Sequence, residues 1–163
     1  MEKPSLYIET SIAGYLAAEQ SRDIITAARQ EVTREWWNTR RSRFRLFTSE
    51  FTVRESEEGN PEAAEQRARV LDGIEELDLD DDVRSLARKL VEEGPLPEKA
   101  ALDALHIAVS ATNEMDYLLT WNMKHIANAA MRNQIEQICR SSGYEAPIMC
   151  TPEELMEDEN DAG

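Results

Sequence analysis

Oxygen-bearing side chains occur just beyond several apolar segments of this 163-residue chain. These side chains are Glu9, Glu50, Glu55, Asp103 and Asn122. Carboxylate and amide oxygens are the ligands that hard cations such as Mg²⁺ and Mn²⁺ prefer. A carboxylate that follows a core strand is also costly to desolvate unless it is paired or bound to metal. The pattern therefore predicts a divalent-cation site, provided that the fold gathers these residues.

Each acid also has a simpler interpretation. Glu9 would serve equally well as an exposed residue at a strand end, or as an acceptor for helix N–H groups near Ser11. Asp103 opens a helix, where acids are favoured by the helix dipole. Glu55 lies in a stretch rich in glutamate, which is typical of a solvated helix face. Position alone leaves both interpretations open for all three residues.

Apolar segments alternate along the chain with segments of helical periodicity. Strands are expected at 6–8, 45–49, 74–79, 116–120 and 147–150. Helices are expected from about Ser11, at 23–39, around 51–55, from Pro61, after 80–82, at 98–112, at about 124–141, and from Thr151. Strands that alternate with helices predict a three-layer α/β/α domain with a mainly parallel sheet of about five strands. Ligands of such sheets bind beyond the carboxyl ends of the strands, where the acids lie.

Length and composition favour one domain, at residues 1–152, followed by an acidic tail at 153–163 that we expect to be partly disordered. The formal net charge of -15 argues against loose, charge-driven binding to nucleic acid. It does not exclude an enzyme with a local basic strip. No apolar run of about 18 residues and no export signal is visible, so we expect a cytoplasmic protein without membrane contact.

The two cysteines, Cys139 and Cys150, belong to no CxxC pair. With only two histidines in the chain, a structural zinc site is not expected. Two buried thiols are the favoured interpretation, and a disulfide is the alternative.

Four segments together resemble the PIN domain, and in particular the VapC-like toxins of bacterial toxin–antitoxin pairs. The matching segments are Tyr7-Ile8-Glu9-Thr10-Ser11, Thr48-Ser49 through Glu55, Asp103-Ala104-Leu105-His106-Ile107-Ala108, and Leu118-Leu119-Thr120-Trp121-Asn122. Each segment alone is a weak signal. Together they cover nearly the whole chain in the order that the family shows.

The resemblance implies roles for individual residues. Glu9, Glu55 and Asp103 would be the metal ligands and part of the catalytic site. Glu55 is preferred over Glu50 because the family places its acid about six residues after a strand-end serine, here Ser49. Asn122 falls where many members carry a fourth catalytic acid. Supporting hydrogen bonds are implied for Thr10, Ser11 and Thr120.

The same resemblance implies a Mg²⁺- or Mn²⁺-dependent endoribonuclease that cuts RNA with a metal-activated water. It also implies a toxin that pairs with a cognate antitoxin and forms a homodimer. The alternative is a PIN-like binding module with weak or no catalysis. Asn122 and the acidic net charge favour that alternative, because an amide adds no charge to a metal site.

A cluster of arginines, Arg40, Arg41 and Arg43, lies near Trp36 and Trp37 and is a candidate RNA contact. A solvated helix end with Trp36 in the core explains the same residues. Trp36, Trp37 and Tyr15 are candidate interface residues, although core packing explains them equally well. His106 and His125 are expected to be structural, with His106 close enough to Asp103 to bond near the site.

Overall fold

Five parallel strands form one sheet in the computed structural model, which describes residues 2–156. The strands are β1 (Ser5–Ile8), β2 (Arg45–Ser49), β3 (Glu75–Leu77), β4 (Tyr117–Leu119) and β5 (Ile148–Cys150), in the spatial order β3-β2-β1-β4-β5. The central strand β1 is buried along its whole length. Glu9 therefore leaves the sheet at its centre, between the ends of β2 and β4.

Two apolar cores cover the two faces of this sheet. Tyr7 and Leu118 point into one core, whereas Leu6, Ile8 and Leu119 point into the other. This alternation follows from the two-residue period of a strand. Because both faces are covered, the strands β1, β4 and β5 are almost continuously apolar, as is usual for parallel sheets.

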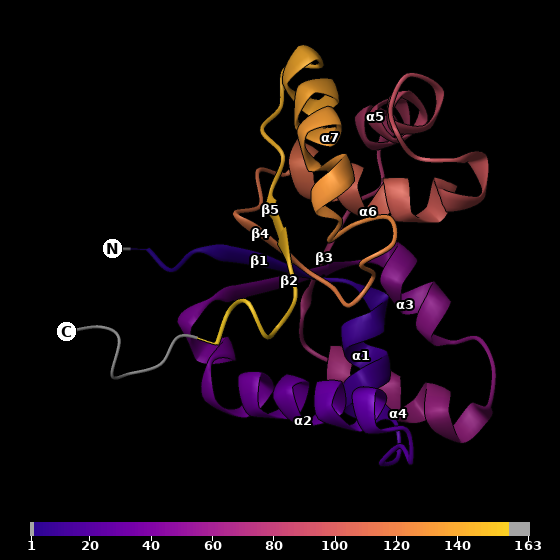
Figure 1. Ribbon diagram of the computed structural model, residues 1–163, viewed down its shortest axis with the longest axis vertical. Coiled ribbons are helices and arrows are strands. Elements are labelled where there is room, and N and C mark those ends of the chain that lie inside the picture. Colours follow the sequence, from indigo (N-terminus) through magenta and orange to yellow (C-terminus); the bar gives the residue numbers. More distant parts are fainter. Residues whose placement is uncertain (1, 157–163) are drawn as a thin grey trace.

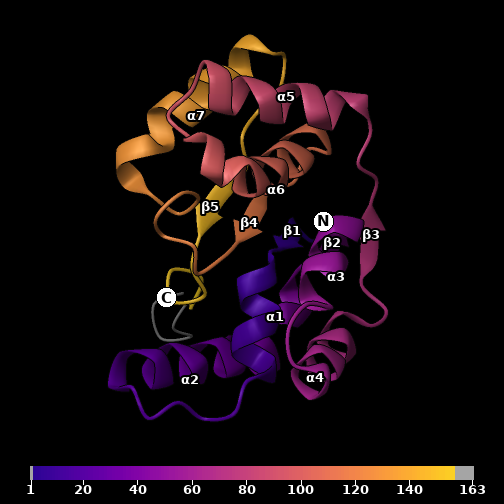
Figure 2. The ribbon, with the colours of Figure 1, turned by 90° about the vertical axis from the view of Figure 1, so that its right-hand side faces the viewer.

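Helices lie on both sides of the sheet, which confirms the predicted three-layer α/β/α arrangement (Figures 1 and 2). On one side are α1 (Thr10–Ala17), α2 (Ile24–Thr39) and α4 (Pro61–Leu71). On the other are α5 (Asp81–Glu92), α6 (Ala101–Thr112) and α7 (Ala129–Ser141). The short α3 (Glu50–Ser56) follows β2, and 3₁₀ turns occupy Arg41–Arg43 and Glu98–Ala100. Helix α6 is buried nearly all round, as its composition predicts.

Short polar side chains cap the N-termini of α2, α3 and α4. Asp23 accepts a hydrogen bond from the Thr26 N–H, and Ser49 accepts one from the Thr52 N–H. Asn60 caps α4, with Pro61 at the first helical position. These caps satisfy N–H groups that have no partner within the helix, and they explain why the predicted starts agree with the structure.

Two expected helices differ from the structure. Helix α7 begins at Ala129 rather than near residue 124, because the Asn122 carbonyl turns the chain by accepting the N–H groups of Ile126 and Ala127. The helix expected from Thr151 is only a turn within the described residues. Thr151 and Glu154 nonetheless exchange both hydrogen bonds of a capping box, at 3.1 and 3.4 Å.

The start of the predicted acidic tail packs against the domain. Leu155 and Met156 are partly buried against the core that contains Leu6 and Ile8. The rest of that prediction, at 157–163, lies outside the described residues. None of the helices within 2–156 is long and apolar enough to cross a membrane.

Cys139 and Cys150 are free and buried, in agreement with the favoured interpretation. Burial raises the pKa of Cys139 to about 11 and the pKa of Cys150 to about 12. Both side chains are therefore protonated, unreactive thiols at neutral pH.

Candidate active site

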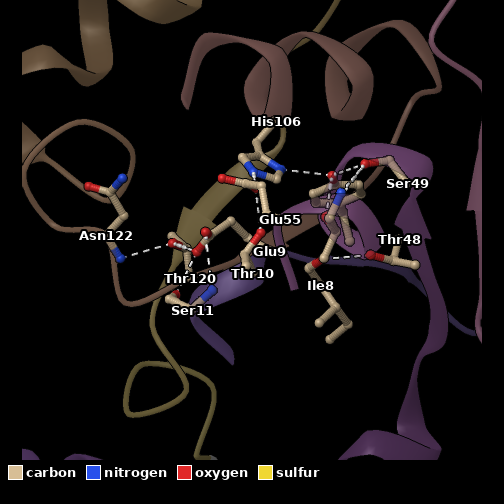
Figure 3. A network of polar contacts seen from close by, with 12 residues as sticks. Ile8, Glu9, Thr10, Ser11, Thr48, Ser49, Glu55, His106, Thr120 and Asn122 are labelled. Carbon is tan, nitrogen blue, oxygen red and sulfur yellow. Dashed lines mark hydrogen bonds and ion pairs between the residues drawn. The ribbon is translucent and has the colours of Figure 1, made fainter. Parts of the chain in front are cut away.

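The candidate site lies beyond the carboxyl ends of β1, β2 and β4. Figure 3 shows Glu9, Thr10, Glu55 and Thr120 gathered in one polar network, with His106 next to Glu55 and Asn122 next to Thr120. The topology causes this arrangement, because parallel strands end at the same edge of a sheet.

Glu9 is the buried centre of the network, with only 6% of the residue exposed. One carboxylate oxygen accepts hydrogen bonds from the hydroxyls of Ser11 and Thr120, both at 2.5 Å. The other accepts the backbone N–H of Ser11 at 3.1 Å, at the start of α1. Glu9 is thus not an exposed strand end. It caps a helix, as its simpler interpretation allowed, and it is also held by Thr120, which follows a second strand.

Thr120 connects Glu9 to the loop after β4. Its hydroxyl donates to Glu9 and accepts the backbone N–H of Asn122 at 2.9 Å. The Asn122 side-chain oxygen in turn accepts the backbone N–H of His125 at 3.0 Å. Asn122 therefore orders its own loop, and its side-chain oxygen already has a donor.

Asp103 lies in the first turn of α6, where its simpler interpretation placed it. Its carboxylate is 3.0 Å from Nδ1 of His125, and 23% of the side chain is exposed. Contacts therefore run without a break from Glu9 through Thr120, Asn122 and His125 to Asp103. The carboxylates of residues 9 and 103 belong to the same edge of the molecule.

Glu55 points into this edge from α3. Its carboxylate accepts the Thr10 hydroxyl at 2.6 Å and contacts Nε2 of His106 at 2.7 Å. Glu50, the alternative second acid, is exposed and pairs instead with Arg54 on the surface of the same helix. The structure thus brings Glu55, and not Glu50, towards the other acids.

Opposing effects act on the pKa of Glu55. Partial burial raises this pKa, since it disfavours the charged carboxylate. The hydrogen bond and charge of His106 and the Thr10 hydroxyl lower it, and the net shift is downward. The carboxylate of Glu55 is therefore ionised at neutral pH and can only accept hydrogen bonds.

The candidate RNA contact lies at the other end of the strands, near the amino ends of β1 and β2. Arg40, Arg41 and Arg43 follow α2 and precede β2, and Arg45 bonds to the backbone of Pro4 at the start of β1. The four residues of β1 separate the two ends by about 13 Å. The structure does not bring these arginines to the acidic site.

The aromatic residues near these arginines pack in two different ways. Trp36 is fully buried in the core, which leaves it unavailable as an interface residue. Trp37 is partly buried, and the Arg41 guanidinium lies over its ring at 4.4 Å. Tyr15 is also partly buried and lies next to the Trp121 ring.

Three site residues had weak or no signal in the sequence. His106 and His125 were expected to be structural, yet each contacts one of the candidate acids. Tyr7 belongs to an apolar strand and to the first family-like segment, and neither predicts that its hydroxyl reaches His106, Ser49 and Thr52. The spacing of Asp103 and His106, one helical turn apart, was the only available signal.

The donor chemistry of this edge suits a hard divalent cation, since Glu9, Glu55 and Asp103 all offer carboxylate oxygens. Within residues 2–156, however, no three His, Cys, Asp or Glu side chains are grouped closely enough to hold one metal ion. The carboxylates instead contact hydroxyl groups and imidazoles. The three carboxylates are chemically suited to the predicted cation. In this structure, however, they lie too far apart to bind one ion together.

No protein-family model and no curated protein sequence matches this chain. Among solved structures, the chain is similar to the crystal structure of Mycobacterium tuberculosis VapC20, a toxin that cleaves the sarcin–ricin loop. The two share 18% identity at a TM-score of 0.48, over 70% of this chain and 87% of the other. Cleavage of the sarcin–ricin loop is a property of the mycobacterial protein.

Proposed function

We propose that this protein is a divalent-metal-dependent endoribonuclease of the PIN type. One observation carries the proposal: the buried Glu9 carboxylate is connected through continuous contacts to Asp103, at the sheet edge where parallel α/β proteins bind ligands. The resemblance of the sequence to VapC-like toxins supports the same activity. Glu55, held beside Thr10, completes the set of three acids.

In this proposal Glu9, Glu55 and Asp103 hold Mg²⁺ or Mn²⁺. When bound, such a cation would activate water and offset the negative charge that develops on a phosphodiester. The surrounding residues orient the acids: Ser11 and Thr120 fix Glu9 by hydrogen bonds. Thr10 and His106 fix Glu55, and His125 contacts Asp103.

In this proposal Asn122 acts through the loop that it orders, and not as a direct ligand of the cation. The residue was expected to complete the catalytic set as a neutral replacement for a fourth acid. Its side-chain oxygen now caps the turn that leads to His125. Asn122 would therefore act on the site mainly by positioning His125, which contacts Asp103.

RNA is the proposed substrate. The proposed partner is a cognate antitoxin that covers the acidic edge, which is the end of the sheet that carries Glu9, Glu55 and Asp103. A homodimer and a cytoplasmic location belong to the same proposal, which follows the resemblance to VapC-like toxins. If Arg40, Arg41 and Arg43 contact RNA, they would do so with a part of the RNA remote from the cleaved bond, because they lie at the other end of β1.

A PIN-like binding module without catalysis is the second candidate. The observation that favours it is the absence, among residues 2–156, of three grouped metal-binding side chains. The two candidates differ in what a divalent cation does to the protein. The nuclease must bind Mg²⁺ or Mn²⁺ at the acidic edge, and the binding module need not.

Cleavage of single-stranded RNA by the purified protein tests the proposal. We expect cutting with Mg²⁺ or Mn²⁺ and none with a chelator. Asp103→Asn should slow cutting by more than about 100-fold, because even residues that only support a metal ligand contribute up to that much. Asp82→Asn is a matched control, since Asp82 is an exposed acid in the first turn of α5.

Two outcomes would contradict the proposal. Equal cutting by the wild type and by Asp103→Asn would remove Asp103 from the site, and would point to a contaminating nuclease. No cutting by the wild type with either cation would favour the binding module.

A further inference from the structure

The imidazole of His106 lies wholly inside the protein, with both ring nitrogens in contact. The residue is 1% exposed. Nε2 is 2.7 Å from the Glu55 carboxylate, and Nδ1 is 2.8 Å from the Tyr7 hydroxyl. Because the ring has almost no access to solvent, it cannot touch a substrate. Of the three candidate acids, Glu55 is the one that the ring contacts directly.

The contacts define which nitrogen carries the proton in the neutral ring. The ionised Glu55 carboxylate only accepts hydrogen bonds, so Nε2 is the donor. In the neutral ring Nδ1 is then an acceptor, to which the Tyr7 hydroxyl can donate. Burial strongly raises the pKa of Tyr7, so that its phenol keeps this proton.

Hydroxyl groups continue the chain on the far side of Tyr7. The Tyr7 oxygen is 2.7 Å from the Ser49 hydroxyl and 3.1 Å from that of Thr52. Either hydroxyl can donate to it while Tyr7 donates to His106. Ser49 is itself fixed, because it caps α3 by accepting the Thr52 N–H. A directed series of hydrogen bonds thus leads from the start of α3 through Tyr7 and His106 to Glu55.

The residues of this series belong to regular elements of the fold. Tyr7 is on the central strand β1, His106 is on the buried helix α6, and Glu55 is on α3. The ring of Phe51, also on α3, packs against the His106 ring with 5.0 Å between centroids. The imidazole has little freedom to rotate, so it holds the Glu55 carboxylate in one orientation.

We propose that Tyr7 and His106 are positioning residues, which fix the tautomer of the imidazole and through it the orientation of the Glu55 carboxylate at the acidic edge. This inference rests on the proposed function, in which Glu55 is a cation ligand. The rival is that His106 merely fills space in the core. Among residues 2–156, His125 offers no equivalent series, because it is partly exposed and its contact with Asp103 is close to the surface.

The test compares His106→Gln, His106→Asn and Tyr7→Phe with the wild type. A glutamine amide nitrogen can take the place of Nε2 and still donate to Glu55, whereas an asparagine amide reaches only the place of Nδ1. Two spectra need no metal: the ¹⁵N resonances of the His106 ring and the ¹³C resonance of the Glu55 carboxylate. The third measurement is the affinity for Mn²⁺ by calorimetric titration.

We expect the wild-type ring to carry its proton on Nε2, and Tyr7→Phe to shift the Nδ1 resonance. The Glu55 carboxylate resonance should move in His106→Asn and return towards the wild-type position in His106→Gln. The Mn²⁺ affinity should fall about 10-fold in His106→Asn, the lower end for residues that orient a metal ligand, and recover in His106→Gln.

Three results would overturn the inference: a ring protonated on Nδ1, a Glu55 resonance unchanged in every variant, or equal loss of Mn²⁺ affinity in His106→Asn and His106→Gln. The last result would identify packing as the role of His106. If the metal-free spectra change as expected but the wild type binds no Mn²⁺, the positioning series is supported and the proposed function fails. The two failures are therefore distinguishable.

Discussion

The hydroxyl of Thr120 lies 2.5 Å from the buried carboxylate of Glu9 and joins the end of β4 to the end of β1. The same hydroxyl accepts the backbone N–H of Asn122. A single side chain therefore stabilises a buried charge and orders the loop that leads to His125. Hydrogen bonds to a buried ionised group are among the stronger ones in proteins.

Removal of this hydroxyl should destabilise the protein. We expect Thr120→Val to lower the free energy of unfolding by about 1–3 kcal/mol, because the Glu9 carboxylate and the Asn122 N–H both lose a partner. Thr120→Ser should retain most of the stability. Urea unfolding followed by circular dichroism measures the difference, with the exposed Thr39→Val as control. Equal effects of the Val and Ser substitutions would contradict this account of Thr120.

Glu55 should contribute to stability in a pH-dependent way. Its pKa is lowered in the folded state from an ordinary value of 4.5. The stabilisation is therefore present above pH 4.5, and is lost as the pH falls through the lower folded pKa. We expect the stability advantage of the wild type over Glu55→Gln, measured in metal-free buffer, to shrink on acidification below pH 4.5. Glu50→Gln, on the exposed side of α3, is the control, and the same pH profile for both variants would contradict the assignment.

The two cysteines should behave as buried thiols. In the folded protein neither Cys139 nor Cys150 should react measurably with a thiol reagent, because both are buried and protonated. Unfolding in denaturant without reductant should release both thiols. Reaction only after addition of a reductant would show a disulfide instead.

Asn122 allows the charge of the site to be changed with little effect on its shape. Aspartate can also accept the His125 N–H, so Asn122→Asp should fold as the wild type does. The added negative charge should increase the affinity for Mn²⁺ if residue 122 faces the cation. An unchanged calorimetric titration would place the residue away from it and would leave it only the role of ordering its loop.

The layers and most elements could be predicted from local signals. The apolar segment at Leu6–Ile8 and the Asn60-Pro61 helix start depend on neighbouring residues alone, and both agree with the structure. The start of α7 was predicted too early, because the competing turn is closed by the carbonyl of Asn122, which periodicity does not reveal. The capping box at Thr151 forms without a helix after it, which shows that a cap alone does not supply helix stability.

The acids of the site could be nominated from their positions, but their partners could not. The contact between Glu55 and His106 joins residues 51 positions apart, and that between Glu9 and Thr120 joins residues 111 apart. The first pair depends on how α3 and α6 pack on the sheet, and the second depends on the pairing of β1 with β4. Tyr7 shows the same limit, because an aromatic residue in an apolar strand gives no local sign that its hydroxyl serves a polar network.

A crystal of the protein soaked in Mn²⁺ would test the central claim most directly. The account predicts an anomalous difference peak at the acidic edge, within coordination distance of the carboxylates of Glu9, Glu55 and Asp103, and no such peak in Asp103→Asn. A peak that lies elsewhere, or no peak in a wild-type crystal that diffracts well, would contradict it.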